Sequence, residues 1–123
     1  MLRNKSILLV ATILPALPFT SSSLAECRMD DIEIRQADWH PFKDDPEYFQ
    51  IVGEFFNRCS EPTGVHLAFT FRNAAGKVVG VKELWPASVR NVEPHASYPF
   101  ELTIAAYADA TSMSVRILEV RRW

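Results

Sequence analysis

Alternation of apolar and polar side chains dominates this chain after its first 25 residues, and it is typical of half-buried β-strands. Residues 65–71 show it most clearly, because valine, leucine and two phenylalanines point one way while histidine, alanine and threonine point the other. Residues 48–57 repeat the pattern, with aromatic and aliphatic side chains and Gly53 on one face. No later stretch has a convincing helical repeat. The pattern therefore predicts a protein built of strands.

Turn signals separate these segments at intervals of about 8–12 residues, which is the spacing expected of an all-β sandwich. Gly76 ends one such turn, residues 73–76, where it supplies the positive φ that the chain needs to re-enter the sheet. The predicted strands cover residues 32–39, 48–57, 65–71, 77–83, 88–92, 98–104 and 113–121. We therefore predict an antiparallel β-sandwich of about seven strands.

Residues 1–25 have the three-part pattern of a secretory signal peptide. Two basic residues precede an apolar run, residues 7–19, and small residues occupy the two positions that a signal peptidase reads. The run is shorter than the roughly 20 residues that a membrane-spanning helix needs. We predict cleavage after Ala25 and a single exported domain, residues 26–123, that is periplasmic or secreted and has no membrane span.

Export makes the two cysteines, Cys27 and Cys59, the partners of a predicted disulfide. Closing the segment between them should stabilise the fold by about 3–4 kcal/mol. If residues 32–39 and 48–57 form an antiparallel hairpin, the start of the first strand lies beside the end of the second. The disulfide would then close the open end of that hairpin.

The charge of the chain excludes one class of partner. The net charge is −2 at pH 7, and it becomes −4 once the predicted leader, with two basic and no acidic residues, is removed. A mildly acidic domain without a basic cluster does not attract nucleic acid or an anionic membrane surface. We therefore exclude nucleic acid as a partner.

The sequence also lacks the residue patterns of a catalytic site. No serine lies in a G-x-S-x-G turn. Both cysteines are assigned to the disulfide, and paired carboxylates occur only as sequence neighbours in loops. We predict no enzymatic activity and no cofactor.

Histidines and methionines keep an alternative open, a periplasmic copper-binding protein, because imidazole and thioether groups suit Cu(I). The five candidate side chains are His40, His66, His95, Met29 and Met113. No two of them have ligand-like spacing, so we assign no metal site. The acidic loop Asp44-Asp45-Pro46-Glu47 lacks the glycine-punctuated spacing of a calcium loop, which favours a solvated loop.

The most notable surface candidate is the segment 77–83, which has apolar side chains on both faces and a lysine near each end. Such a strand is either buried on both faces or exposed at the edge of a sheet. We hypothesise that Val79 and Val81, with neighbouring Trp85, accept a partner strand or peptide by β-augmentation. In the alternative, the valines pack under the loop that holds Trp85 and Pro86.

The last three residues, Arg121-Arg122-Trp123, stand outside the strand pattern. The terminal tryptophan either folds back on the sheet or contacts a partner.

Several features together resemble the FxLYD domain, a small immunoglobulin-like β module of bacterial and archaeal envelope proteins. They are Ile51-Val52-Gly53-Glu54 followed by Asn57, the strand 65–71, Ala75-Gly76-Lys77-Val78-Val79-Gly80, a turn at Pro94, and Phe100-Glu101-Leu102. The chain departs from the family at Thr103 and Ile104, where the family has Tyr and Asp, and at His95, where it has glycine. The resemblance implies an immunoglobulin-like fold, a role in interactions and no catalytic residues.

The function that we predict is an exported, non-enzymatic binding or accessory module of the bacterial cell envelope. Its expected partner is another envelope protein or a peptide. Besides the copper-binding alternative, a secreted inhibitor of an envelope hydrolase would share this fold and differ only in its partner.

Overall fold

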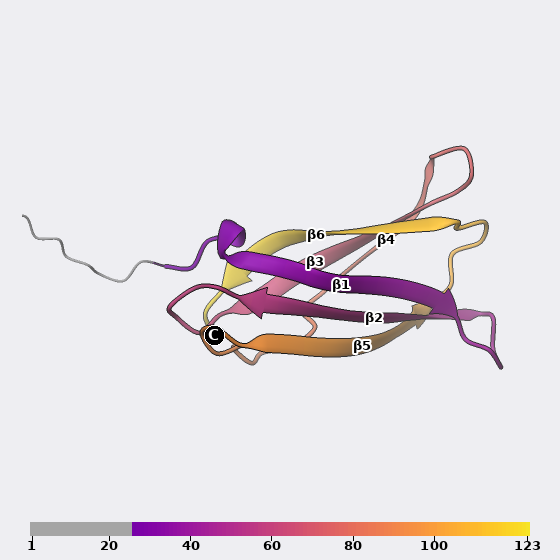
Figure 1. Ribbon diagram of the computed structural model, residues 1–123. Coiled ribbons are helices and arrows are strands. Elements are labelled where there is room, and N and C mark those ends of the chain that lie inside the picture. Colours follow the sequence, from indigo (N-terminus) through magenta and orange to yellow (C-terminus); the bar gives the residue numbers. More distant parts are fainter. Residues whose placement is uncertain (1–25) are drawn as a thin grey trace, which may run out of the picture.

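The computed structural model describes residues 26–123, which form two three-stranded antiparallel sheets packed face to face (Figure 1). The elements are the short 3-10 turn η1 (Met29–Asp31) and the strands β1 (Ile32–Pro41), β2 (Tyr48–Asn57), β3 (Gly64–Arg72), β4 (Val78–Leu84), β5 (Ser97–Ala105) and β6 (Ser112–Arg121). One sheet has the order β1-β2-β5 and the other β4-β3-β6. The predicted all-β antiparallel sandwich is therefore confirmed.

The predicted leader, residues 1–25, lies outside the described residues, so the leader and its cleavage stay predictions. Within residues 26–123, the structure holds no helix with the length and apolar character needed to cross a membrane.

Six of the predicted segments form these strands, and the remaining one, residues 88–92, contributes a single bridge between Thr63 and Val92. Two turns keep this segment from extending, because the N–H of Ser88 donates to the Trp85 carbonyl and that of Arg90 to the Ala87 carbonyl. Ser88 also has a φ of 58°, in the left-handed region. The structure therefore has a single β-bridge at Val92 where the sequence predicted a seventh strand.

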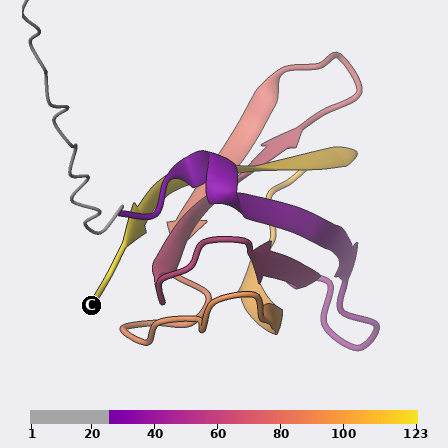
Figure 2. The ribbon, with the colours of Figure 1, turned by 60° about the vertical axis from the view of Figure 1, so that its left-hand side comes forward.

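The central strands β2 and β3 supply most of the core. Every second residue of β2 is buried, and β3 buries all four of its predicted inward side chains. The largest fully buried apolar side chains are Phe55, Phe69, Phe71, Ile51, Leu67 and Val65. Figure 2 shows the two layers from another side, with β1 and β2 in one layer and β3, β4 and β6 in the other. The alternation in the sequence thus predicted the buried faces correctly.

Gly53 permits a close approach between β2 and its neighbours. A Cβ atom at this position would lie 2.5 Å from the Phe100 ring and 2.8 Å from the carbonyl oxygen of Gln36. The absence of a side chain therefore lets the Phe100 ring lie directly on the β2 backbone.

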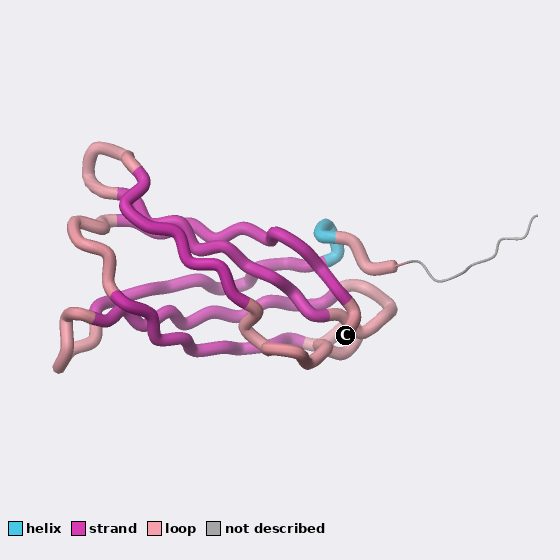
Figure 3. The backbone as a smooth tube through the Cα atoms, turned by 180° about the vertical axis from the view of Figure 1, so that it is seen from behind, coloured by secondary structure: helices cyan, strands magenta, loops and turns pink. Residues whose placement is uncertain are grey.

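The loops gather at the two ends of the sandwich, as Figure 3 shows. We call the closed end the segments 27–31, 57–63, 85–96 and 121–123, and the open end the loops 42–47, 73–77 and 106–111. At the open end the predicted hairpin turn is confirmed, with Gly76 at a φ of 81°. Asn73 accepts hydrogen bonds there from the N–H groups of Ala75 and Lys77.

Candidate interaction surface

Strand β4 forms one edge of the β4-β3-β6 sheet, so it has a paired strand on one side only. None of its residues is buried, and its exposed apolar side chains include Val78 and Val81, which are 50% and 47% exposed. The edge position that our hypothesis requires is therefore present in the structure.

The two valines of that hypothesis have different surroundings. Val79 is half-buried and packs against the core. Val81 pairs with Thr70, which lies between the buried Phe69 and Phe71 on β3 and so faces away from the core. Val79 therefore packs against the core, whereas Val81 is exposed at the edge of the sheet.

Tyr107 covers part of the β4 edge. Its hydroxyl donates a hydrogen bond of 3.1 Å to the carbonyl oxygen of Val81. Its ring lies against Gly80, where a Cβ atom would be only 2.2 Å from the ring. A partner strand that paired with β4 at Val81 would have to displace this hydroxyl, so the side-chain face of β4 is more accessible than its backbone.

Trp85 lies just beyond β4 and is the centre of an aromatic cluster on the outer face of the sheet. Its ring stacks on His66 at 4.6 Å between centroids, with only 5° between the planes. Trp123 approaches it edge-on, with ring centroids 5.1 Å apart. Pairs of this kind contribute about 0.5–1.5 kcal/mol beyond the area they bury. Trp85 is therefore half-buried by neighbours from β3 and from the C-terminus.

The C-terminal tryptophan, Trp123, folds back on the sheet, which is one of the two alternatives that the sequence left open. Its backbone N–H donates to the Asn91 side chain at 2.9 Å, and its carbonyl accepts from the same side chain at 3.3 Å. The indole lies over Gly64, where a Cβ atom would be 2.4 Å from its nitrogen. Trp123 remains 43% exposed and so is accessible to a partner as well.

Charged side chains surround these rings. The two ring nitrogens of His66 lie 3.8 Å from a Glu83 oxygen and 3.9 Å from a Glu119 oxygen. Arg121 pairs with Glu119 at 3.0 Å, and its guanidinium lies 5.4 Å from the Trp85 ring and 5.0 Å from the Trp123 ring. This arrangement offers flat aromatic surface bordered by hydrogen-bonding groups, which suits recognition of another molecule.

We call the set Val81, Glu83, Trp85 and Trp123 the β4 strip. The pairing of Glu83 with Ala68 places it on the same outer face as Val81. The strip therefore presents an exposed aliphatic side chain, a carboxylate and two indoles along one side of the sheet.

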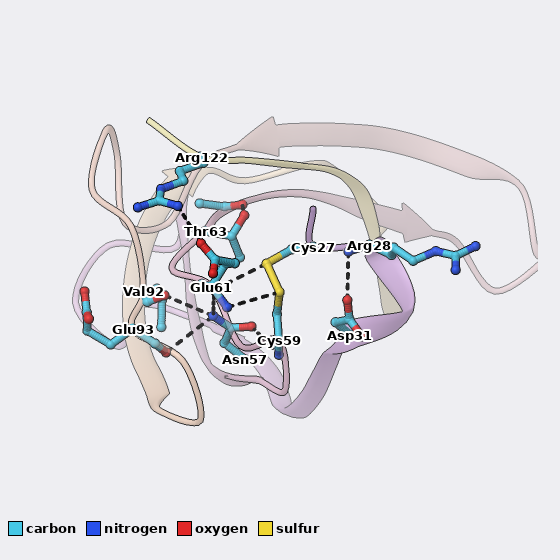
Figure 4. Close-up of a disulfide and its surroundings, with 11 residues drawn as sticks. Cys27, Arg28, Asp31, Asn57, Cys59, Glu61, Thr63, Val92, Glu93 and Arg122 are labelled. Atoms are coloured by element: carbon cyan, nitrogen blue, oxygen red, sulfur yellow. Dashed lines mark hydrogen bonds and ion pairs between the residues drawn. A yellow bond between two sulfur atoms is a disulfide. The ribbon is translucent and has the colours of Figure 1, made fainter. Parts of the chain in front are cut away.

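At the closed end the predicted disulfide is confirmed: Cys27 and Cys59 are bonded, with their Cα atoms 5.6 Å apart (Figure 4). Ile32 pairs with Asn57 at the start of β1 and the end of β2. The disulfide therefore joins the two strands of the first hairpin at the end opposite their connecting loop, as the strand pattern and the cysteine positions predicted.

Asn57 ties three segments together beside the disulfide (Figure 4). Its side chain is fully buried. The amide nitrogen donates to the carbonyls of Glu61 and Val92, each at 3.0 Å, and more weakly to that of Glu93 at 3.4 Å. The amide oxygen accepts from the Cys59 N–H at 2.8 Å. Both polar atoms of this buried side chain are satisfied, so its burial stabilises the closed end.

A cleft of about 490 Å³ lies beside the disulfide, between the loop 61–63 and the end of β6. Four of its charged groups compensate one another, because Arg122 pairs with Glu61 at 2.6 Å and Arg121 with Glu119. The remaining lining charge, Glu26, takes part in no ion pair within residues 26–123, and this single carboxylate does not point to a particular ligand.

The structure does not bring the five copper candidates together. His40 ends β1 at the open end, whereas His95 donates its backbone N–H to Asn57 at the closed end. His66 lies on the outer face of β3, and Met113 packs against the core. Met29 is exposed in η1. Across residues 26–123, no group of three histidine, cysteine, aspartate or glutamate side chains is placed to hold a metal ion.

Comparison with protein-family models, with curated proteins and with solved structures gave no match. The resemblance to the FxLYD domain therefore stays a prediction that rests on the residues quoted for it.

Sequence reasoning missed the stack of His66 on Trp85 and the contact of Tyr107 with β4. Part of the signal for the first contact was in the sequence, because alternation places His66, the second residue of the segment 65–71, on the outward face. The second joins loop 106–111 to a strand more than 20 residues earlier, and no local pattern predicts such a contact.

Proposed function

We propose that this protein is an exported, non-enzymatic binding module of the bacterial cell envelope that recognises a protein partner through the β4 strip. The observation that carries the proposal is the exposure of Val81 on an edge strand, on the outer face of the sheet that also carries the indoles of Trp85 and Trp123. Aromatic anchors with an apolar neighbour and a polar border are typical of protein interfaces.

The disulfide is compatible with an oxidising compartment outside the cytoplasm. The leader pattern of residues 1–25 supports export. The resemblance to an envelope interaction domain supports the same role.

The hydrogen bond from Tyr107 to the backbone of β4 determines which mode of binding we expect. Because the hydroxyl of Tyr107 occupies the Val81 carbonyl, we expect contact through side chains of the outer face. Strand addition would require the hydroxyl to move, and Tyr107→Phe would then strengthen binding rather than leave it unchanged.

The test is site-specific photo-crosslinking of the full chain, expressed in a bacterium that exports it. A photoreactive residue at position 81 should trap a discrete partner, and one at the matched position 29 should not, because Met29 is also 47% exposed and lies in η1, which contacts β6 at the opposite edge of the sheet. Val81→Lys should abolish the adduct formed from a photoreactive residue at position 83, while Met29→Lys should leave it intact.

Equal adducts from positions 81 and 29, or an adduct at position 83 that Val81→Lys does not weaken, would contradict the proposal. Val79→Lys is not a suitable variant, because Val79 packs against the core and its replacement would lower stability.

A further inference from the structure

We propose that the open end of the sandwich carries a second interaction surface, a groove that binds a basic, proline-containing extended segment of a partner protein. A hollow of about 500 Å³ lies there between the loop 42–47 and the loop 106–111. Its lining includes Trp39, Pro41, Pro46, Tyr107, Ala108 and Ala110. The loops that border the hollow belong to the open end, whereas Cys27 and Cys59 are bonded at the closed end.

Most of the side chains that line the walls of the hollow are short or rigid, and this helps to keep it open. Ala106, Ala108 and Ala110 line one wall, and two prolines line the other. Neither residue type has a flexible side chain that could fold over and fill the space.

The floor of the groove is aromatic and fixed. Trp39 packs on Phe49 with ring centroids 4.7 Å apart, and Tyr107 packs on Phe71 at 5.2 Å. Phe49 and Phe71 are buried core residues. The rings that face the groove are therefore held by the core, and a ligand would not have to order them.

Backbone hydrogen bonds hold the two loops in place. The N–H of Ala106 donates to the Glu47 carbonyl at 2.9 Å and so joins one loop to the other. Within the loop 42–47, the N–H of Phe42 donates to Tyr48 and that of Tyr48 to Asp45. A groove with a fixed floor and joined walls is pre-formed for binding.

The charge of the two loops selects the ligand. They carry four carboxylates and one cationic side chain, Lys43; the carboxylates belong to Asp44, Asp45, Glu47 and Asp109. Glu47 and Asp109 belong to the lining itself. None of the four takes part in an ion pair with another residue of the range 26–123. A partner that brings lysine or arginine would supply the missing charge.

The shape and the aromatic lining favour an extended segment with proline. Grooves lined by aromatic and proline side chains bind polyproline II segments, whose conformation is already restricted and so loses little entropy on binding. Arginine side chains of such a segment could lie along the Trp39 and Tyr107 rings and reach the carboxylates of the rim.

The experiment is a titration of the isotopically labelled protein, purified after expression of the full chain, with three capped nonapeptides followed by NMR. The first alternates arginine with proline and leucine, the second has glutamate in place of each arginine, and the third combines the same arginines with glycine and serine. We expect saturable shifts of the Trp39 indole N–H and the amides of residues 106–110 with the first peptide. The other two should shift these signals at least roughly tenfold more weakly.

Two variants locate the binding. Ala108→Leu should fill the groove and abolish the shifts, while Ala74→Leu, an equally exposed alanine in the neighbouring hairpin, should not. Asp109→Asn, which removes the charge and tolerates the left-handed φ of 67° at this position, should weaken binding of the arginine peptide severalfold. Because positions 74, 108 and 109 are exposed, the variants are expected to fold, and their amide spectra would verify it.

Binding that Ala108→Leu leaves unchanged, equal shifts with all three peptides, or no shift at Trp39 would overturn the proposal. The β4 strip would be untouched by that result, because its test uses different residues and a different readout.

Discussion

The two ends of the sandwich are built in different ways. At the closed end, a disulfide, a buried asparagine and a folded-back tryptophan join segments that are distant in the sequence. At the open end, the loops 42–47 and 106–111 are joined by one backbone hydrogen bond, and alanines and prolines leave a hollow between them. The difference indicates that the interactions that stabilise the fold are concentrated at the closed end. Side chains of the open end can therefore be replaced with little loss of stability.

The largest expected effect is that of the disulfide. In Cys27→Ser/Cys59→Ser the unfolded chain regains the freedom that the crosslink removes, so the free energy of unfolding should fall by about 3–4 kcal/mol. Denaturant unfolding monitored by circular dichroism measures it. Ala108→Leu at the open end should change stability by less than about 0.5 kcal/mol, and an equal loss in both variants would show that the ends do not differ.

Next in size is the buried amide of Asn57. Asn57→Ala leaves the carbonyl of Glu61 and the N–H of Cys59 without their partner and removes one of the two hydrogen bonds to the Val92 carbonyl, which should cost about 2–3 kcal/mol. The matched variant is Asn73→Ala in the exposed hairpin turn of the open end, where water replaces the lost bonds and the cost should stay below about 1 kcal/mol. Urea unfolding of both proteins gives the difference, and the reverse order would refute the contrast.

A smaller effect is expected for the C-terminal residue. Trp123→Ala removes an edge-on contact with Trp85 and cover from Gly64, and it should lower the free energy of unfolding by about 1 kcal/mol. Tyr48, at the open end, is exposed to almost the same extent, 44% against 43%, so Tyr48→Ala is the control and should cost less than about 0.5 kcal/mol. Thermal unfolding measures both, and a neutral Trp123→Ala would mean that the fold-back contributes no stability.

The smallest effect concerns an ion pair at the closed end. The hydrogen bond from Arg58 holds the pKa of Glu33 below its ordinary value. Desolvation opposes this shift, whereas the positive charge of Arg58 and the hydrogen bond and charge of Arg35 also lower the pKa. A lowered pKa in the folded state stabilises the fold at neutral pH, and this contribution is lost as the pH falls through the carboxyl titration.

Arg58→Ala should therefore lower the melting temperature slightly at pH 7, and this difference should disappear as the pH falls through the lowered pKa of Glu33 and the carboxyl becomes protonated in both proteins. Melting curves across this range measure it. Lys43→Ala at the open end should show no such dependence on pH, since Lys43 takes part in no ion pair within the part of the chain that the structure describes.

The alternation of side chains was sufficient to predict which faces of β2, β3 and β5 are buried, because each of these strands has one face toward the core. It could not predict the strand order, since β5 pairs with β2 and β6 with β3, which are distant in the sequence. The segment 88–92 was misread as a strand because its composition resembles one, whereas the left-handed conformation of Ser88 turns the chain.

The candidate surface was predictable only in part. Val81 was identified because an apolar strand with lysines is typical of an edge. The same pattern grouped Val79 with it, although a bulge in the β3–β4 pairing between Phe71 and Arg72 falls where Val79 stands. Sequence spacing does not reveal bulges, and so it could not assign the two valines to different faces.

The stack of His66 on Trp85 gives the molecule an optical signal of its own. A histidine ring in contact with an indole quenches its fluorescence, so the emission of Trp85 should rise when the stack is broken. Trp39, the tryptophan of the open end, has phenylalanine rings as its aromatic neighbours and lacks this quencher. The three tryptophans of the chain thus report separately on the two ends, without any attached dye.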